Sequence, residues 1–502
     1  MSLYSPPKVD VNVVANPRVI NIAGDARLLA IVGVGPTSRT VTDEAIYRGA
    51  GAIDVLAANP QSASITKVAK RSNLYYVAGG SSNDVDAVPG INGSLYTGSV
   101  TNGYTALSGA RLSWPQDAAT QIASGTVPAT GSVYYVSYTY AVPESQYLPT
   151  TFSDKTPLTA MYGAENNTTG CLTVAGSLAL ENGAPAVICV QASGSIDTIS
   201  VADYRNAIDK LRKKSNIEEI VCIFPSGSMS PVTFRDDVQT YLFQHTQLMG
   251  LKSRWRGMYY GTASPYYNPT TMGATDAIGD SATAVSYIGK AIAYAHEDVV
   301  LPAPTYVWRY DSDNNRIELD ASYVACAIGG LKSAQLLRST PITGATLTGF
   351  TIEEDKWDVF QMDLLGSNGV CVVTNTSGVN SIRDAITTDP TSADTQEQSV
   401  IGQKRNVERT LETKLFQTYT NKGKTINAQT ARDVEATTRS ILNALRQAGE
   451  IYGYGVKDDP NTGEVKIVAI QDTTEPRRIN VTCSIKYLYP LKYITVTVST
   501  YV

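Results

Sequence analysis

Hydrophobic and polar residues form two different strand patterns near the start of the chain. Residues 8–14 alternate apolar and polar side chains, which predicts a strand with one buried face. Residues 27–35 form an almost continuous apolar run. Such a run is typical of a strand that is buried on both faces of a parallel sheet. The pattern therefore predicts a separable first strand followed by the first strand of a core.

The residue pattern changes between residues 64 and 149. Charged residues become scarce, Gly, Ser, Asn and Tyr become frequent, and short strand-like runs alternate with turn clusters. Residues 132–140 give the clearest strand pattern of this region. We interpret residues 64–149 as a mainly-β domain that is inserted into a different fold.

Helix and strand patterns alternate from residue 172 onward. Helices are predicted over residues 172–182, 199–214 and 232–249, and strands over residues 186–190, 219–225 and 257–260. Repeated units of this kind predict a parallel or mixed sheet with helices on both faces.

The last third of the chain repeats the mixture of helices and strands. Strands are predicted at residues 369–373 and 479–486, and long helices at residues 399–419 and 428–448. The chain then alternates apolar and polar residues from residue 493 to residue 502. This last pattern predicts a second separable strand at the C-terminal end.

The predicted fold class is multidomain α/β, because strand and helix patterns alternate over most of the 502 residues. We expect an α/β core with a mixed sheet, an inserted β domain, a C-terminal α/β domain and two extended strand arms. The expected boundaries are an N-terminal arm at 1–26, a core at 27–63 and 150–345, an insert at 64–149, a C-terminal domain at 346–490 and a C-terminal arm at 491–502.

The composition favours a protein that contacts other subunits. Charged residues make up 17% of the chain, against about 25% in typical soluble proteins. Tyrosine is also abundant, with 30 Tyr against 7 Phe and 4 Trp, and tyrosine is enriched at interfaces. A low-charge monomer and a Tyr-rich β domain are the plain alternatives to these two interpretations.

The sequence gives no indication of a nucleic-acid or membrane partner. The net charge is −5 and there is no long basic run, so no nucleic-acid footprint is expected. No apolar run approaches the roughly 18 to 20 residues of a membrane span, and the first residues do not form a signal peptide. We expect folding and assembly in the cytoplasm without membrane insertion. The six cysteines contain no CxxC pair, which argues against a zinc or redox motif.

An α/β core often holds an active site, but the sequence shows none of the usual motifs of one. The loop at residues 33–38 resembles a dinucleotide-binding loop, but its third glycine is missing and Pro36 lacks a backbone N–H. His245 and His296 are the only histidines and no nucleophile motif accompanies them. We therefore predict no catalytic residue, no cofactor and no metal site.

Acidic residues cluster at three places without forming an active site. Residues 353–355 and 458–459 lie among polar or turn-forming residues and are interpreted as solvated loops. Residues 311–315 faintly resemble a calcium loop but lack the Gly and the terminal Glu of an EF-hand, so a plain turn is predicted.

The two alternating strands at the ends of the chain are its most informative feature. A terminal strand must pair its backbone groups, either within its own domain or on the sheet of a neighbour. Pro6–Pro7 and Pro490 precede the two segments and mark them as separable. The apolar positions that would face the partner sheet are Val9, Val11, Val13, Ile494, Val496 and Val498.

Three segments of the chain resemble the sheath proteins of contractile phage tails. Residues 172–184 read LTVAGSLALENGA and lead into the strand at 187–191. Residues 320–330 read DASYVACAIGG, like a small-residue helix of that family. The segment from residue 378 to the C-terminus, with GVNSI, a long helix that ends in GEIYGY, and the final arm, is similar again.

This resemblance implies a structural subunit without enzymatic activity. Sheath subunits stack as six-fold rings around a tail tube, and their terminal arms join the sheets of neighbouring subunits. Contraction then drives the tube through the host envelope. The implied partners are other copies, the tube protein, and baseplate and tail terminator proteins, and the implied location is the phage virion. The insert would be an outward-facing domain.

The resemblance also implies which helix faces the tube. The helix at residues 428–448 carries Arg432, Asp433, Glu435 and Arg439, which are candidate tube-facing residues. An ordinary solvated helix face explains the same charges equally well. At the level of function, two alternatives remain open at this point: another self-assembling adhesin, tube or surface-layer protein, and an α/β enzyme with an unrecognised site.

Overall fold

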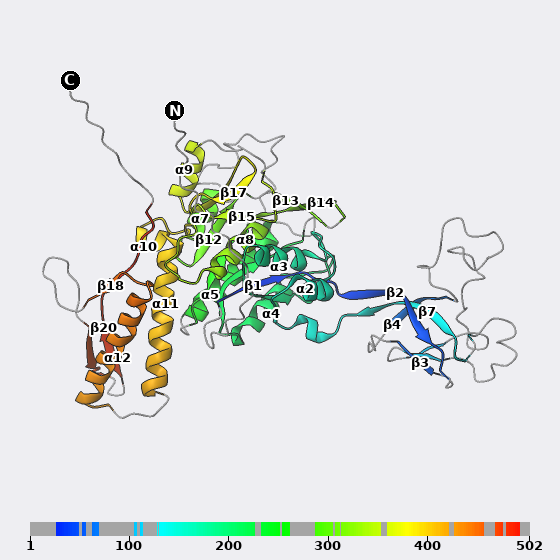
Figure 1. The fold of residues 1–502 in the computed structure, drawn as a ribbon, viewed down its shortest axis with the longest axis horizontal. Coiled ribbons are helices and arrows are strands. Elements are labelled where there is room, and N and C mark those ends of the chain that lie inside the picture. Colours follow the sequence, from blue (N-terminus) through cyan, green and yellow to red (C-terminus); the bar gives the residue numbers. More distant parts are fainter. Residues whose placement is uncertain are drawn as a thin grey trace, which may run out of the picture.

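The computed structural model describes most of the chain between the two predicted arms (Figure 1). The described residues are 27–49, 53–56, 63–69, 105–107, 111–113, 128, 130–225, 232–250, 254–261, 287–304, 307–311, 313–352, 359–420, 426–455, 467–474 and 478–491. The six apolar arm positions, Val9, Val11, Val13, Ile494, Val496 and Val498, lie outside these residues, so strand exchange through them stays a prediction.

A nine-stranded mixed sheet forms the core, in the order β15-β17-β16-β12-β11-β10-β1-β9-β8. Its strands are β1 (Leu28–Gly33), β8 (Thr150–Phe152), β9 (Val187–Gln191), β10 (Ile217–Cys222), β11 (Gly257–Tyr259), β12 (Val299–Ala303), β15 (Thr346–Leu347), β16 (Val370–Thr376) and β17 (Val379–Ile382). The six strands from β16 to β9 run parallel, and antiparallel strands close both edges. The central strands are wholly buried, as their continuous apolar runs predict.

Helices pack against this sheet in two groups. They are α2 (Lys155–Tyr162), α3 (Cys171–Glu181), α4 (Val201–Lys210), α5 (Val232–Gly250), α7 (Tyr287–Ala293), α8 (Ala321–Ala334) and α9 (Val359–Ser367), with short 3-10 turns at η4 (Glu144–Tyr147) and η5 (Leu211–Lys213). The connections from β1 to β9 and from β9 to β10 run in opposite directions along the sheet. Right-handed crossovers therefore place α3 and α4 on opposite faces.

The close packing of α3 against α8 explains the small-residue sequence of α8. A Cβ atom added to Gly330 would overlap the backbone oxygen of Ala179 on α3. Nearly every residue of α8 is buried, because the helix lies between α3 and the sheet strands β1, β10 and β12. A helix that contacts its surroundings on all sides needs an apolar surface and short side chains where backbones approach.

In its described part, the predicted insert contains two small antiparallel sheets, which Figure 1 shows at a distance from the core. They contain β2 (Ser38–Tyr47), β4 (Ala63–Ala69) and β7 (Val133–Ala141), and β3 (Ile53–Val55), β5 (Thr105–Leu107) and β6 (Arg111–Ser113). Because β2 pairs with β7 over most of its length, these sheets begin near residue 38 rather than at the expected residue 64. Tyr134 and Tyr138 fill the core between these strands.

A C-terminal unit packs on the other end of the core. It contains α10 (Ala393–Gln396), α11 (Gln398–Leu415), a π-helical turn η6 (Phe416–Thr420), α12 (Ala428–Gln447), β18 (Gly453–Tyr454), β19 (Val468–Gln471), β20 (Ile479–Thr482) and β21 (Ile485–Lys486). Its own small core holds Val407, Leu442, Ile451 and Ile467. The strands β15–β17 belong to the nine-stranded sheet, so this unit starts later than the expected boundary at residue 346.

The remaining hairpin confirms the prediction of a plain turn at residues 311–315. Strands β13 (Val307–Tyr310) and β14 (Arg316–Leu319) pair antiparallel around it. The Asp311 carboxylate accepts the backbone N–H groups of Asp313 and Asn315 at 2.9 and 2.7 Å. Among the described residues, no helix is long and apolar enough to span a bilayer.

Candidate functional site

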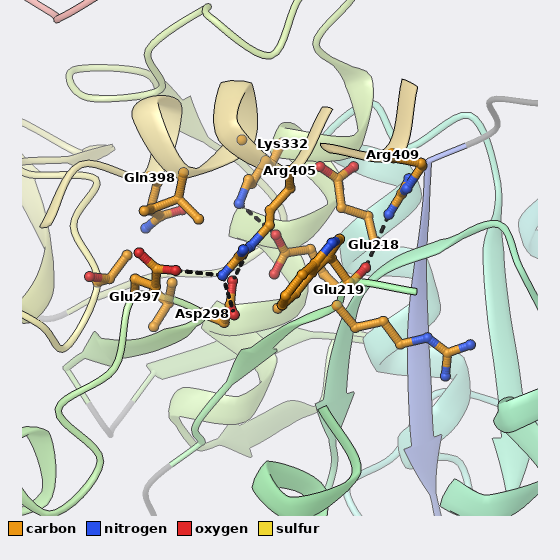
Figure 2. Close-up of a pocket in the computed structure, with 15 residues that line it drawn as sticks. Glu218, Glu219, Glu297, Asp298, Lys332, Gln398, Arg405 and Arg409 are labelled. Carbon is orange, nitrogen blue, oxygen red and sulfur yellow. Dashed lines mark hydrogen bonds and ion pairs between the residues drawn. The ribbon is translucent and has the colours of Figure 1, made fainter. Parts of the chain in front are cut away.

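Helix α11 is the element on which the contacts of functional interest meet. It crosses the amino-terminal ends of β10, β11 and β12, and a cavity lies between it and these strand ends (Figure 2). Its first turns are buried and its last turns are partly exposed.

Arg405 of α11 holds the helix to the core through a buried ion pair. Its Nε and Nη2 atoms lie 3.0 and 2.7 Å from the two carboxylate oxygens of Asp298, just before β12. The same guanidinium lies 2.6 Å from Glu297 and 4.1 Å from the centre of the Trp255 ring. Burial alone would lower the pKa of Arg405, but its carboxylate partners Asp298 and Glu408 raise it above its usual range.

Two further ion pairs line the same cavity. Lys332 at the end of α8 lies 2.5 Å from Glu219, and Arg338 pairs with Glu218. Burial raises the pKa of Glu219, and the charge of Lys332 opposes that rise. Gly257 lies beside this pair, where a Cβ atom would overlap the Glu219 carboxylate. The negative charges of Glu218 and Glu219 beside the cavity are thus each matched by a basic side chain.

The segments that lead to both predicted arms contact α11 on one face. At the C-terminal end, the side-chain amide of Gln403 bonds both backbone groups of Leu488, each at 2.8 Å. At the N-terminal end, Arg27 donates to the Asn406 side chain at 3.3 Å and lies 3.7 Å from Glu450. Gln403 and Asn406 are three residues apart, so they lie on the same side of the helix. Arg27 and Leu488, near the two ends of the described chain, therefore lie close to the same face of α11.

The candidate tube-facing residues lie on α12, and the structure separates them into two pairs. Arg432 and Asp433 are exposed. Glu435 and Arg439 are partly buried and bond each other at 2.9 Å across one helical turn. Figure 1 shows α12 beside α11 at the edge of the molecule away from the insert. Their contact with a tube stays a prediction.

The loop that resembles a dinucleotide-binding loop is filled by the protein's own side chains. A Cβ atom on Gly35 would overlap Gln191, whose amide donates to the Pro36 carbonyl at 2.9 Å. Gln146 donates to Gln191 at 2.8 Å and accepts from Arg39 at 2.8 Å. The space that a phosphate group would need beside this loop is therefore occupied.

Several of the described polar groups near the carboxyl ends of the parallel strands are also paired with one another. This edge is where α/β proteins usually bind ligands. After β11, the Tyr260 hydroxyl donates to Asp236 at 2.5 Å, and Lys290 lies 2.6 Å from the same carboxylate. Arg235 pairs with Asp320, the N-cap residue of α8, at 2.5 Å. These groups serve the packing of α5, α7 and α8.

Both histidines have structural partners. Nε2 of His245 lies 2.9 Å from the Arg256 guanidinium, which can only donate, so this nitrogen is the acceptor. Burial and the charges of Arg256 and Arg212 lower the pKa of His245 to about 3. The His296 Nδ1 atom accepts the backbone N–H of Asp298 at 3.1 Å. Within the described ranges, no group of three or more His, Cys, Asp or Glu side chains has a geometry that would hold a metal.

The residues that join α11 to the core were not predicted from the sequence. Glu297 and Asp298 are separated from Lys404 and Arg405 by more than a hundred residues. The available signal was an acidic pair directly before a buried strand and a basic pair inside an amphipathic helix. Neither pair alone indicates its partner, because charged pairs on helices are usually solvated.

One curated protein is similar to part of this chain, whereas no protein-family model matches the chain. The tail sheath protein of Mycobacterium phage Bxz1 is 24% identical over 281 residues. The match covers 54% of this chain and 44% of that protein, so it spans less than half the length of the relative.

Two solved structures share the fold. The helical sheath of the anti-feeding prophage in its contracted state matches with a TM-score of 0.51 and 13% identity, over 71% of this chain and 89% of its own. The six-fold symmetrised baseplate of the anti-feeding prophage matches with a TM-score of 0.52 and 12% identity, over 72% and 90%. The comparisons confirm the resemblance to contractile tail sheath proteins, and these two structures share the α/β fold.

Proposed function

We propose that the chain is the structural subunit of a contractile phage tail sheath and has no enzymatic role. The similarity to a tail sheath protein supports this assignment at the level of the family. Assembly through exchanged terminal strands is supported by one observation. Leu488 and Arg27, which lead to the two predicted arms, contact Gln403 and Asn406 on one face of α11.

The closeness of the two segments that lead to the arms fits a mechanism of strand exchange. A strand that adds to a neighbour's sheet forms main-chain hydrogen bonds that are insensitive to side-chain identity. If both arms leave from one helix, connections to two neighbouring copies are tied to the same rigid element. The core can then rotate while the connections persist, which is what stacked six-fold rings need during contraction.

The proposed partners follow from this assembly. Copies of the chain would surround a tail tube protein, with a baseplate at one end and a terminator protein at the other, in the phage virion after assembly in the host cytoplasm. We assign the tube-facing role to α12, where Arg432 and Asp433 are exposed. Reversing the charge of Arg432 should weaken cosedimentation with assembled tubes, whereas reversing the charge of Lys155 on α2 should not.

Negative-stain electron microscopy of the purified chain tests the proposal. We expect hollow cylinders from the full chain and none from a version that lacks residues 1–16 and 491–502. Val11→Pro removes one backbone N–H from the predicted first strand and should also prevent cylinders. Asp10→Ala, on the other face of that strand, is the matched control. Compact single particles from every version would contradict the proposal.

A further inference from the structure

Within the described chain, α11 and everything after it are joined to the core by one covalent connection. We call the described residues from Gln398 to Leu491, which are the C-terminal unit without α10, the α11 module. At the connection, Ile386 and Glu397 form an isolated β-bridge, and the Gln398 backbone N–H donates to the Ala385 carbonyl at 3.1 Å. A part with one covalent connection can move as a body when the contact surface allows it.

The α11 module and the core sheet have separate apolar cores. Val407, Leu442, Ile451 and Ile467 fill the core of the module. The buried residues of the nine-stranded sheet and its helices form another cluster, and the two clusters share no residue. Each part therefore buries apolar side chains of its own, so the module can keep its fold when the contact between the two parts opens.

Charged side chains make much of the contact between the module and the core, as Figure 2 shows for Arg405. Beside the pair of Arg405 with Asp298, the Lys404 Nζ atom lies 2.8 Å from both carboxylate oxygens of Glu297. Arg409 donates to the backbone carbonyl of Trp255 at 3.0 Å. Water hydrates such groups once they separate, so an ionic contact costs less to open than an apolar contact of the same area.

Each side of this contact also has ion pairs of its own. Lys332 pairs with Glu219 within the core, and Arg405 pairs with Glu408 within α11 at 2.9 Å. Glu408 lies one turn further along the same helix, so it stays beside Arg405 when the helix moves. The module can therefore open without leaving the Arg405 guanidinium unpaired.

The contact is incompletely packed. Ile401 and Gly402 of α11 line the cavity that separates this helix from the strand ends. The Oε1 atom of Gln398, a residue that is only 1% exposed, has no hydrogen-bond partner among the described residues. Protein interiors are normally close-packed and pair their buried polar atoms. A cavity beside an unpaired amide oxygen leaves room for water, which favours a contact that opens over a permanent one.

The residue directly before β1 bridges the same contact. Arg27 donates to the Leu336 carbonyl at 3.4 Å on the core side, and to Asn406 at 3.3 Å on the module side. It also lies 3.7 Å from Glu450 of the module, which accepts the backbone N–H of Arg338 at 2.9 Å. The predicted N-terminal arm precedes Arg27 in the sequence, so a displacement of that arm would act first on this bridge.

We propose that the α11 module is hinged at Glu397 and opens from the core as one body, and that Arg27 helps to hold it closed. The inference deepens the proposed function and rests on it only for the consequence in an assembly. There the core turns against a module that stays joined to its neighbours, so a ring changes shape without breaking its arm connections.

Thiol labelling of Gly402→Cys in the full chain tests the opening. A Cβ atom on Gly402 lies 3.3 Å from the Arg338 carbonyl oxygen and 3.6 Å from the Arg338 Cβ atom, so the core covers a thiol there when the module is closed. Cys326 on α8 is buried in the core and reports global unfolding. Iodoacetamide and mass spectrometry give both rates in one sample. We expect the introduced thiol to react at least about 100-fold faster than Cys326.

Charge substitutions in this variant test what holds the module closed. Lys404→Glu removes an ion pair and places a like charge beside Glu297, so the introduced thiol should react about 10-fold faster. Arg27→Ala should accelerate the reaction by a similar factor. Lys414→Glu changes an exposed lysine further along the same helix and is the matched control, which should change the rate less than about twofold.

Two further variants distinguish opening of the module from unfolding. Leu178→Ala on α3 removes a wholly buried side chain of the core. It should accelerate the reaction of Cys326 and leave that of the thiol at position 402 unchanged. Leu442→Cys places a thiol inside the core of the module, where it stays covered when the module opens as one body. That thiol should react at least about 10-fold more slowly than the thiol at position 402.

The outcomes decide the inference separately from the proposed function. Equal rates at position 402 and Cys326, or acceleration at position 402 by Leu178→Ala, would overturn it, because the thiol would then react only after global unfolding. Equal rates at positions 402 and 442 would overturn it too, since α11 would then unfold rather than open. If G402C does not fold, Ile401→Cys, which removes atoms beside the cavity, gives the same readout. All these measurements use the free chain, so a failure to form cylinders counts against the sheath assignment alone.

Discussion

The ion pair between Arg405 and Asp298 should carry much of the docking of α11 onto the core. The guanidinium contacts both carboxylate oxygens, and the two side chains are only 12% and 7% exposed. Replacing Arg405 with Ala leaves Asp298 buried beside Glu297 without its main counter-charge. Removal of one partner of a buried pair costs about 3–5 kcal/mol, whereas an exposed pair is worth at most about 1 kcal/mol.

The structure provides a matched control for this prediction. Arg439 and Glu435 on α12 also form an Arg–carboxylate pair, at 2.9 Å, but their side chains are 43% and 30% exposed. Arg439→Ala should therefore change the stability by no more than about 0.5 kcal/mol. Both variants lose an arginine, so a difference between their losses of stability measures the effect of burying the ion pair.

Hydrogen exchange measured by mass spectrometry is the suitable assay, because a chain with several domains need not unfold in one step. Peptides from α11 should exchange roughly 100-fold faster in R405A than in the unmodified chain, which corresponds to about 3 kcal/mol. The cycle with D298A and the double variant should give a coupling energy of about 2 kcal/mol.

Two results would refute this reasoning. A coupling energy below about 0.5 kcal/mol would mean that the pair contributes no more than a solvated one. Equal exchange rates for α11 peptides in R405A and R439A would mean that apolar contacts alone hold the helix.

Three further predictions follow from packing and ionisation. Gly330→Val should lower the melting temperature by several degrees through overpacking against α3, whereas Gly453→Ala, with open space around it, should not. The pKa of buried His245 is lowered to about 3, so the unfolded chain binds more protons than the folded chain between pH 3 and 6.5. Stability should fall with decreasing pH over this window by at most about 1.4 kcal/mol per unit, and H245Q should show a shallower fall in urea titrations. Five of the six cysteines are buried and Cys483 is intermediate, so Ellman's reagent should react with at most one thiol before unfolding and with six afterwards; rapid reaction of more would contradict the packing.

The parts of the fold that could be predicted are those encoded in local runs. Helix α3 and strand β9 lie within one residue of their predicted ranges, because β9 is buried along its whole length and α3 is buried from Cys171 to Ala179, and both segments are mostly apolar. Strand β2 was missed, because it carries Arg39, Asp43 and Glu44 and depends on pairing with β7 about ninety residues later. The ion pairs of Arg405 were not predicted for the same reason, since the two partners of each main pair are distant in sequence.

The attachment of the β sheets that start at Ser38 has an evolutionary consequence. The chain leaves the core after Thr37 and returns at Val142, and the backbone N–H of Val142 bonds the Thr37 carbonyl at 3.0 Å. Hydrogen bonds among three side chains, Gln146, Gln191 and Arg39, hold the outgoing and the returning segment together at the end of β9. Exit and entry are adjacent, so a short turn could replace everything between them without moving the core. The segment is thus a module that a lineage can lose, enlarge or exchange while the sheet that carries it remains unchanged.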